Sequence, residues 1–168
     1  FPEINLRFYV RAGAERGVVF IREFVPSRLI AWSARWVYNE PYAAVPMRSG
    51  ISEDRDAVHL EHTLDVGGRA QRIALRGGKA TYLPEEDSVE HFFKEHHWGF
   101  GRTRGGRTLR YEVRHPRWLV HPVLETRIDV DWGLMYGPKW SFLAGAAPYS
   151  TVFAVGSEVA VYPKGKLT

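Results

Sequence analysis

Residues 4–11 alternate between apolar and polar side chains, which is typical of a β-strand with one buried face. The apolar side chains are those of Leu6, Phe8 and Val10, and the polar ones are those of Asn5, Arg7, Tyr9 and Arg11. Residues 18–21 form a continuous apolar run, which indicates a second strand covered on both faces. We expect these two strands to form a buried hairpin.

A helical pattern follows the second strand. Residues 29–37 carry large apolar side chains at helical spacing, and Ser27 stands where a helix N-cap would. Pro41 pushes the preceding residue out of helical geometry, so this helix ends within the sequence YNEPY, residues 38–42. A further strand then begins within residues 43–48.

Two pairs of glycines predict tight β-hairpins, because consecutive glycines supply the positive φ angles of a type I′ turn. The first pair, at residues 67–68, joins two alternating segments, and the second, at residues 105–106, lies in the sequence GRTRGGRTLR. A two-residue loop at the second pair fixes the register of its hairpin. One face of that hairpin then carries Trp98, Phe100, Arg102, Leu109, Tyr111 and Val113.

Three more segments complete the pattern. Residues 83–97 predict a short helix capped at Asp87 or Ser88, and residues 119–132 and 150–163 predict two more strands. The whole pattern predicts a mainly β (α+β) fold with an antiparallel or mixed sheet, closed or nearly closed, and two short helices.

Length and composition limit the number of domains and exclude several kinds of site. A length of 168 residues with 45% apolar residues predicts one domain over residues 1–168. The absence of cysteine excludes disulfides, thiolate nucleophiles and cysteine-bound zinc, and it favours a cytoplasmic location. No apolar run is long enough to cross a membrane, so we expect no membrane partner. Because Phe1 already lies in strand-like sequence, we expect an upstream segment to be missing.

The net charge of +4 is compatible with an anionic ligand but does not demand nucleic acid. Residues 101–117 hold the densest group of arginines, with aromatic residues between them, a pattern that also suits single-stranded nucleic acid. The predicted register divides these arginines between the faces and the tip of the hairpin. A solvated hairpin is therefore the favoured interpretation.

Four stretches resemble, in chain order, the YqjF-like proteins of unknown function (domain of unknown function 2071) in the acetoacetate decarboxylase-like superfamily. The stretches are PEINLRFYV, GVVFIREFVPSRLIAWSARWVYNEPYAAVPM, SVEHFFKEHHWGFGRTRGGRTLRYEVRHPRW and VAVYP. The resemblance spans nearly the whole chain. It implies a closed or cone-shaped, largely antiparallel β-barrel that encloses a cavity for a small molecule.

In that superfamily, the corner that corresponds to residues 38–42 carries a catalytic residue. In acetoacetate decarboxylase itself, the corresponding corner ends in a lysine that forms an imine with the β-keto acid. Aligned on Tyr38 and Pro41, this chain has Tyr42 where the lysine would stand. Since a phenol cannot form an imine, imine-type decarboxylation is disfavoured.

The resemblance implies a set of ligand-binding residues at the start of the chain and at the corner. They are Glu3, Asn5, Arg7, Tyr9, Tyr38, Tyr42 and Met47. Arg7 would hold a carboxylate through its planar guanidinium group. Two ordinary alternatives remain open: a solvated face for the first strand, and a Tyr42 that only packs at a turn.

Three residues are candidates for acid–base catalysis: Tyr42, Glu95 and His97. The predicted register also sets His96 opposite His115, but hydrogen-bonded histidines are favoured over a metal site. We therefore expect no metal and no cofactor.

Three functions follow from these observations. The first is binding of an anionic or carbonyl-bearing small molecule in a β-barrel cavity, without the Schiff-base lysine. The second is a lyase-like enzyme that acts on a keto or hydroxy acid by acid–base chemistry. Nucleic-acid binding is the least favoured, and the oligomeric state is left open.

Overall fold

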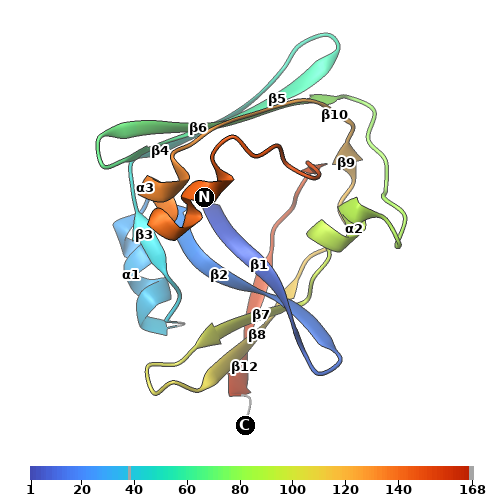
Figure 1. The fold of residues 1–168 in the computed structure, drawn as a ribbon. Coiled ribbons are helices and arrows are strands. Elements are labelled where there is room, and N and C mark those ends of the chain that lie inside the picture. Colours follow the sequence, from blue (N-terminus) through green and yellow to red (C-terminus); the bar gives the residue numbers. More distant parts are fainter. Residues whose placement is uncertain (38, 167–168) are drawn as a thin grey trace. The chain divides into compact units, whose positions relative to one another are not determined.

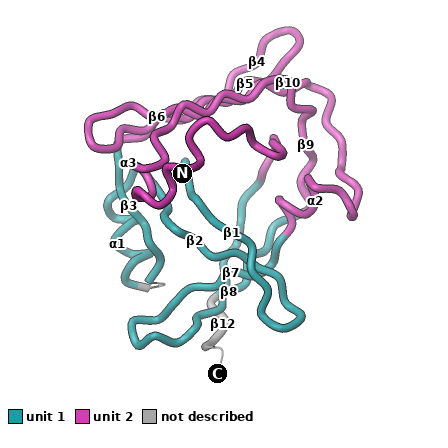
Figure 2. Tube along the Cα trace, in the orientation of Figure 1, with its two compact units in different colours: residues 1–45, 96–116, 157–168 teal, residues 46–95, 117–156 magenta. Residues whose placement is uncertain are grey.

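The computed structural model of the chain describes residues 1–37 and 39–166. The chain forms two compact units, each built from separate stretches of sequence (Figure 2). Unit 1 comprises residues 1–45, 96–116 and 157–168, and unit 2 comprises residues 46–95 and 117–156. The single domain expected from the length stays a prediction.

Unit 1 is built on a six-stranded sheet with one helix (Figure 1). Its strands run in the order β1-β2-β7-β8-β12, and β3 pairs with β2 beyond the end of β7. Strand β2 pairs in parallel with β3 and β7, and the other pairs are antiparallel. The elements are β1 (Ile4–Ala12), β2 (Glu15–Val25), α1 (Arg28–Val37), β3 (Tyr42–Ala44), β7 (Trp98–Arg102), β8 (Thr108–Arg114) and β12 (Ala160–Lys166).

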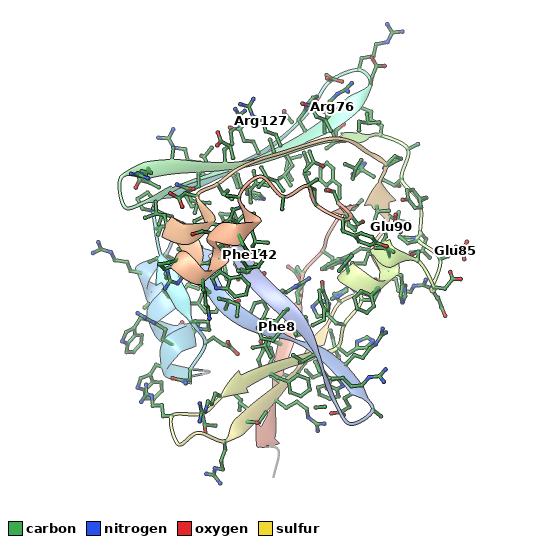
Figure 3. All side chains as sticks on the ribbon, viewed as in Figure 1. Phe8, Arg76, Glu85, Glu90, Arg127 and Phe142 are labelled. Atoms are coloured by element: carbon green, nitrogen blue, oxygen red, sulfur yellow. The ribbon has the colours of Figure 1, made fainter. Side chains whose placement is uncertain are left out.

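The predicted hairpin of the first two strands is confirmed, with its turn at Gly13, whose φ is +63°. The predicted burial of residues 18–21 on both faces is only partly right, because Val18 is buried but Val19, Phe20 and Ile21 are half-buried. The fully buried apolar end of β2 comes later, at Phe24 and Val25. The burial predicted for the apolar side of β1 is only partly right. Phe8 is 43% exposed on β1 (Figure 3).

The predicted helix and its cap are confirmed. The Ser27 hydroxyl accepts a hydrogen bond from the Ile30 N–H at 3.3 Å, which satisfies one free donor of the first turn. Helix α1 ends before Pro41, and Asn39 takes a positive φ of +54° in the turn that follows. Tyr38 lies outside the described residues.

The register predicted for the second glycine-pair hairpin is wrong by one residue. Gly99 pairs with Tyr111, and Trp98 pairs with Glu112. The reason is the loop: Thr103 N–H donates to the Arg107 carbonyl at 2.8 Å, which leaves three loop residues instead of two. Because side chains alternate with a period of two, this shift moves Tyr111 to the face opposite to that of Trp98.

Unit 2 contains a four-stranded antiparallel sheet in the order β10-β6-β5-β4 and a two-stranded sheet of β9 and β11. The glycine-pair hairpin between β5 and β6 is confirmed, with φ angles of +61° and +79°. Arg76 on β6 and Arg127 on β10 lie on one face of the larger sheet (Figure 3). The strands are β4 (Met47–Glu53), β5 (Ala57–Val66), β6 (Arg69–Gly78), β9 (Val120–His121), β10 (Val123–Asp129) and β11 (Phe153–Ala154).

Three short helical segments lie in unit 2: α2 (Val89–Lys94), α3 (Trp132–Tyr136) and the 3-10 helix η1 (Pro138–Leu143). Ser88 caps α2, as one of the two predicted caps. The strand predicted to reach residue 132 stops earlier, because the Asp131 carboxylate accepts from the Leu134 N–H at 2.9 Å and starts α3.

The mainly β fold is confirmed, but the closed or cone-shaped barrel is not found. None of the three sheets formed by the described residues closes on itself, since β1 and β12 end one sheet, β10 and β4 the second, and β9 and β11 the third. The final strand is also broken, since β11 and β12 belong to different sheets on either side of Gly156. Among the described residues, none of the helices has the length and hydropathy of a membrane span.

The observed register predicts unequal costs for two glycine substitutions. A Cβ on Gly99 would lie 2.1 Å from Cζ of Tyr111, whereas one on Gly105 would meet nothing within 4 Å. We expect Gly99→Ala to lower the free energy of unfolding by about 1–3 kcal/mol, because the buried ring cannot move aside. Gly105→Ala should change it by less than about 1 kcal/mol. Urea denaturation measures the free energy of unfolding of both variants. Equal effects of the two substitutions would contradict the observed register and support the predicted two-residue loop.

Candidate functional site

Glu23 is the buried acid around which the candidate site forms. It lies on β2 with 2% of its surface exposed. The register of β1 and β2 shifts by one residue beside it, so Glu23 faces the same side as Phe20 in spite of their odd spacing. Asn5 on β1 and Tyr42 on β3 pair directly with Glu23 and therefore share its face.

The corner at residues 38–42 is held against this strand by its backbone. The Glu23 N–H donates to the Pro41 carbonyl at 3.2 Å, and the Tyr42 N–H donates to the Glu40 carbonyl at 2.9 Å. The corner therefore does more than turn the chain. It presents two side chains to the sheet of unit 1, the carboxyl group of Glu40 and the phenol of Tyr42.

Tyr42 and two acids share hydrogen bonds. The Tyr42 hydroxyl donates to Oε2 of Glu3 at 3.1 Å, and the Asn5 amide donates to Oε1 of Glu3 at 2.9 Å. The Tyr42 hydroxyl and the Glu3 carboxyl group also hydrogen-bond with Glu23. We call Glu3, Asn5, Glu23 and Tyr42 the acid–phenol cluster.

Burial keeps Glu23 protonated. Loss of solvent raises the pKa of Glu23 from 4.5 to about 9, with further contributions from the charges of Glu3 and Glu40. Near pH 7, Glu23 is therefore a neutral acid that donates its proton towards Glu3. Burial raises the pKa of Tyr42 as well, with further contributions from Glu3 and Glu23, so its hydroxyl remains a donor.

A second acid–phenol pair lies in the same unit. Burial raises the pKa of Glu40 to about 7, and a hydrogen bond with the Tyr111 hydroxyl partly offsets that rise. Two glycines of β7 make room for the pair. A Cβ on Gly101 would lie 2.6 Å from Oε1 of Glu40, and one on Gly99 would overlap the Tyr111 ring.

Each of the two buried acids keeps one oxygen without a partner. Oε1 of Glu23 and Oε1 of Glu40 are buried and make no hydrogen bond among the described residues. Glu40 is 7% exposed, so solvent reaches neither acid freely. A buried acceptor without a donor costs free energy, so neither acid is fully satisfied by the described residues.

The other predicted residues of β1 form a neighbouring contact. Arg7 and Tyr9 share the face of Asn5, and an Arg7 Nη2 donates to the Tyr9 hydroxyl at 3.5 Å. The Tyr9 ring also meets the His96 ring edge-on at 6.1 Å. The structure thus groups Glu3, Asn5 and Tyr42 by direct hydrogen bonds and pairs Arg7 with Tyr9.

The remaining candidates have other surroundings within their own units. Met47 and Glu95 belong to unit 2, where Met47 pairs with Leu64 and Glu95 forms an ion pair with the buried Lys94. His97 is in unit 1 but exposed, and its carbonyl accepts from the Val113 N–H at 2.8 Å.

The predicted opposition of His96 and His115 is wrong, because the register of the hairpin is shifted by one residue. With His97 bonded to Val113, the residue across from His96 is Arg114. The part of the chain that the structure describes holds no group of three residues suited to a metal ion.

Sequence reasoning missed Glu23, Glu40 and Tyr111 as site residues. One signal was present: Glu23 is an acid next to a run predicted to be covered on both faces, where an unpaired charge is costly. The alternating glycines at 99 and 101 were a second signal, since they leave room for large groups. The register shift beside Glu23 leaves no mark in the sequence.

The arrangement suits hydrogen-bond donation to a carbonyl oxygen. A neutral carboxylic acid beside a phenol can stabilise charge that develops on such an oxygen, because both groups donate in a site with little solvent. Glu40 adds a group that changes protonation near neutral pH, which is what acid–base catalysis requires.

The chain is similar to proteins of one uncharacterised family. The family model DUF2071, described as "Uncharacterized conserved protein (COG2071)", matches residues 1–158. The uncharacterized protein YqjF of Bacillus subtilis (strain 168) is 29% identical over 133 residues, covering 78% of this chain and 53% of YqjF. The chain thus spans about half the length of this relative. No solved structure matches the chain. The superfamily resemblance stays a prediction.

The raised pKa of Glu23 predicts how stability changes with pH. From the unfolded pKa of 4.5 up to about 9, the unfolded chain has lost this proton and the folded chain retains it. Folding is therefore penalised as the pH rises through this window, by up to about 1.4 kcal/mol per pH unit. We expect Glu23→Gln to remove this contribution in urea denaturation between about pH 5 and pH 8, while the smaller contribution of Glu40, whose pKa is raised to about 7, remains.

The control for this experiment is Glu158→Gln, an exposed acid of the same unit. Glu158→Gln should leave unchanged the difference in the free energy of unfolding between mildly acidic and mildly basic pH. Parallel curves for the wild type and Glu23→Gln would show that Glu23 is ionised in the folded protein.

Proposed function

This chain belongs to the DUF2071 family of uncharacterised conserved proteins, and we propose that unit 1 binds a small carbonyl-bearing molecule through the acid–phenol cluster, without a Schiff-base lysine. The observation that supports this is the Tyr42 hydroxyl, which is hydrogen-bonded to two carboxyl groups, one of them kept protonated by burial. Both Tyr42 and Glu23 then carry a proton, and a carbonyl oxygen of the ligand would accept these protons in place of the Glu3 carboxyl group.

The charges of the cluster select among ligands. Glu3, Glu23 and Glu40 are close enough for Glu3 and Glu40 to raise the pKa of Glu23. An anion placed among these acids would be repelled in the same way, so a neutral carbonyl group is favoured there. A carboxylate on the same ligand would have to lie towards Arg7, two residues after Asn5 on the same face.

A second candidate function is acid–base catalysis on a keto or hydroxy acid, as in a lyase. One observation favours it: the pKa of Glu40 is raised to about 7, while its hydrogen-bond partner Tyr111 stays protonated. A base and a donor side by side can remove a proton next to a carbonyl group and stabilise the resulting enolate. Glu95 and His97 would then have no part in the chemistry of unit 1.

The binding proposal predicts a specific effect of removing one hydroxyl. Acetylacetone, as a neutral dicarbonyl probe, should bind the wild type in ligand-observed NMR, and Tyr42→Phe should weaken it roughly three- to tenfold, because one hydrogen bond is lost. The matched control is Tyr149→Phe, since Tyr149 is 88% exposed in unit 2. Equal affinity for the wild type and Tyr42→Phe would contradict a role for the cluster.

Experiments with keto acids distinguish binding from catalysis. They also test whether any lysine of the chain forms an imine. Because Tyr42 replaces the amine, acetoacetate with borohydride should give no covalent adduct by mass spectrometry. If the chain is a lyase-like enzyme, a screen of keto acids should show turnover that rises as Glu40 ionises near pH 7 and is abolished in Glu40→Gln. An adduct on a lysine, the buried Lys94 above all, would revive the imine mechanism.

A further inference from the structure

The two units carry opposite charge. Unit 1 has 13 Lys and Arg against six Asp and Glu, whereas unit 2 has 10 against 13. The overall charge of +4 is therefore the sum of a strongly basic unit 1 and a mildly acidic unit 2. An anionic surface would be attracted to unit 1 in particular.

Helix α1 exposes large apolar side chains on unit 1. The exposed fractions are 72% for Leu29, 62% for Trp32 and 65% for Trp36. The rings of Trp32 and Trp36 stack on each other, with centroids 6.3 Å apart and planes 12° apart. At about 100° per residue, the three side chains form one strip along the helix.

Arginines border this strip. Arg28 and Arg35 are exposed, and at the same angular spacing they fall within about 60° of Trp32 on the helix surface. Helix α1 contains no acidic residue. We call Arg28, Leu29, Trp32, Arg35 and Trp36 the basic aromatic face.

More positive charge lies beside the end of the helix. The Asn39 amide donates to the Arg102 carbonyl at 2.6 Å, which ties the turn after α1 to the tip of the β7–β8 hairpin. Arg104 and Arg107 are exposed on this tip. Both elements belong to unit 1 (Figures 1 and 2).

We propose that the basic aromatic face docks unit 1 on an anionic phospholipid surface. Tryptophan and leucine side chains favour the boundary between headgroups and acyl chains, and arginines favour the anionic headgroups around them. The sequence predicted no membrane partner because it lacks a membrane span, but a helix that lies on the surface needs no span.

Two other occupants fit the face less well. Single-stranded nucleic acid would use the rings of Trp32 and Trp36 for stacking but would gain nothing from Leu29, the most exposed of the three. A second copy docked by two-fold symmetry would bring the arginines of one face against those of the other, which is repulsive.

Vesicle sedimentation tests this proposal. The wild type should sediment with vesicles of phosphatidylcholine and phosphatidylserine and much less with phosphatidylcholine alone. The double variant Trp32→Ala, Trp36→Ala should lose roughly tenfold or more in affinity, while Trp32→Phe, Trp36→Phe should retain most of it. The matched control is Phe142→Ala, Tyr149→Ala, two aromatic residues that are 71% and 88% exposed in unit 2.

Charge is tested separately from the apolar strip. Arg28→Gln, Arg35→Gln should weaken binding to anionic vesicles and reduce its dependence on salt. The control is Arg55→Gln, Arg127→Gln, two exposed arginines of unit 2, which should bind as the wild type does.

The proposal would be overturned by a lack of binding to anionic vesicles, by equal binding of the tryptophan-to-alanine variant, or by oligonucleotide binding that depends on these residues while vesicle binding does not. Dimerisation through the same side chains in place of vesicle binding would also overturn it. Circular dichroism confirms that each variant is folded. Tyr42→Phe should bind vesicles normally, so this test stands apart from the ligand-binding proposal.

Discussion

Burial of one carboxyl group in the sheet of unit 1 is the constraint from which the candidate site follows. Glu23 has 2% of its surface exposed, and an ionised carboxylate in that place would be costly. Protonation removes the charge, and Glu3 and Tyr42 then take part in its hydrogen bonds. The low local dielectric that makes the ionised carboxylate unfavourable also strengthens the hydrogen bonds that the protonated acid donates. Burial of Glu23 therefore lowers stability and provides a donor at the same time.

The rest of unit 1 makes room for a second acid and its phenol. Gly99 and Gly101 lack the side chains that would collide with Tyr111 and Glu40. The corner before β3 brings Glu40 and Tyr42 to the sheet from either side of Pro41. A barrel is not needed for this arrangement, since the cluster forms on one face of an open sheet.

The units differ in charge as well as in content. Unit 1 holds the acid–phenol cluster and the basic aromatic face of α1, whereas unit 2 holds an acidic excess and the four-stranded sheet of β4, β5, β6 and β10. Four acids of unit 1 add little negative charge to its surface. Glu23 and Glu40 are buried, and Glu15 and Glu112 form ion pairs with arginines. The arginines of its surface are left with few acids to offset them.

The sequence by itself determined the local elements: the first hairpin, the Ser27-capped helix, its end before Pro41 and the hairpin at residues 67–68. These depend on near neighbours, so capping, proline geometry and alternation suffice to predict them. The resemblance also put forward Glu3, Asn5 and Tyr42 as candidates, and the structure joins these three by hydrogen bonds. Only the tertiary structure decided the hairpin register at Gly99 and the register shift beside Glu23, because both depend on pairing between strands. Each of those one-residue shifts turns a side chain to the opposite face, and they put Glu23 and Tyr111 into the site.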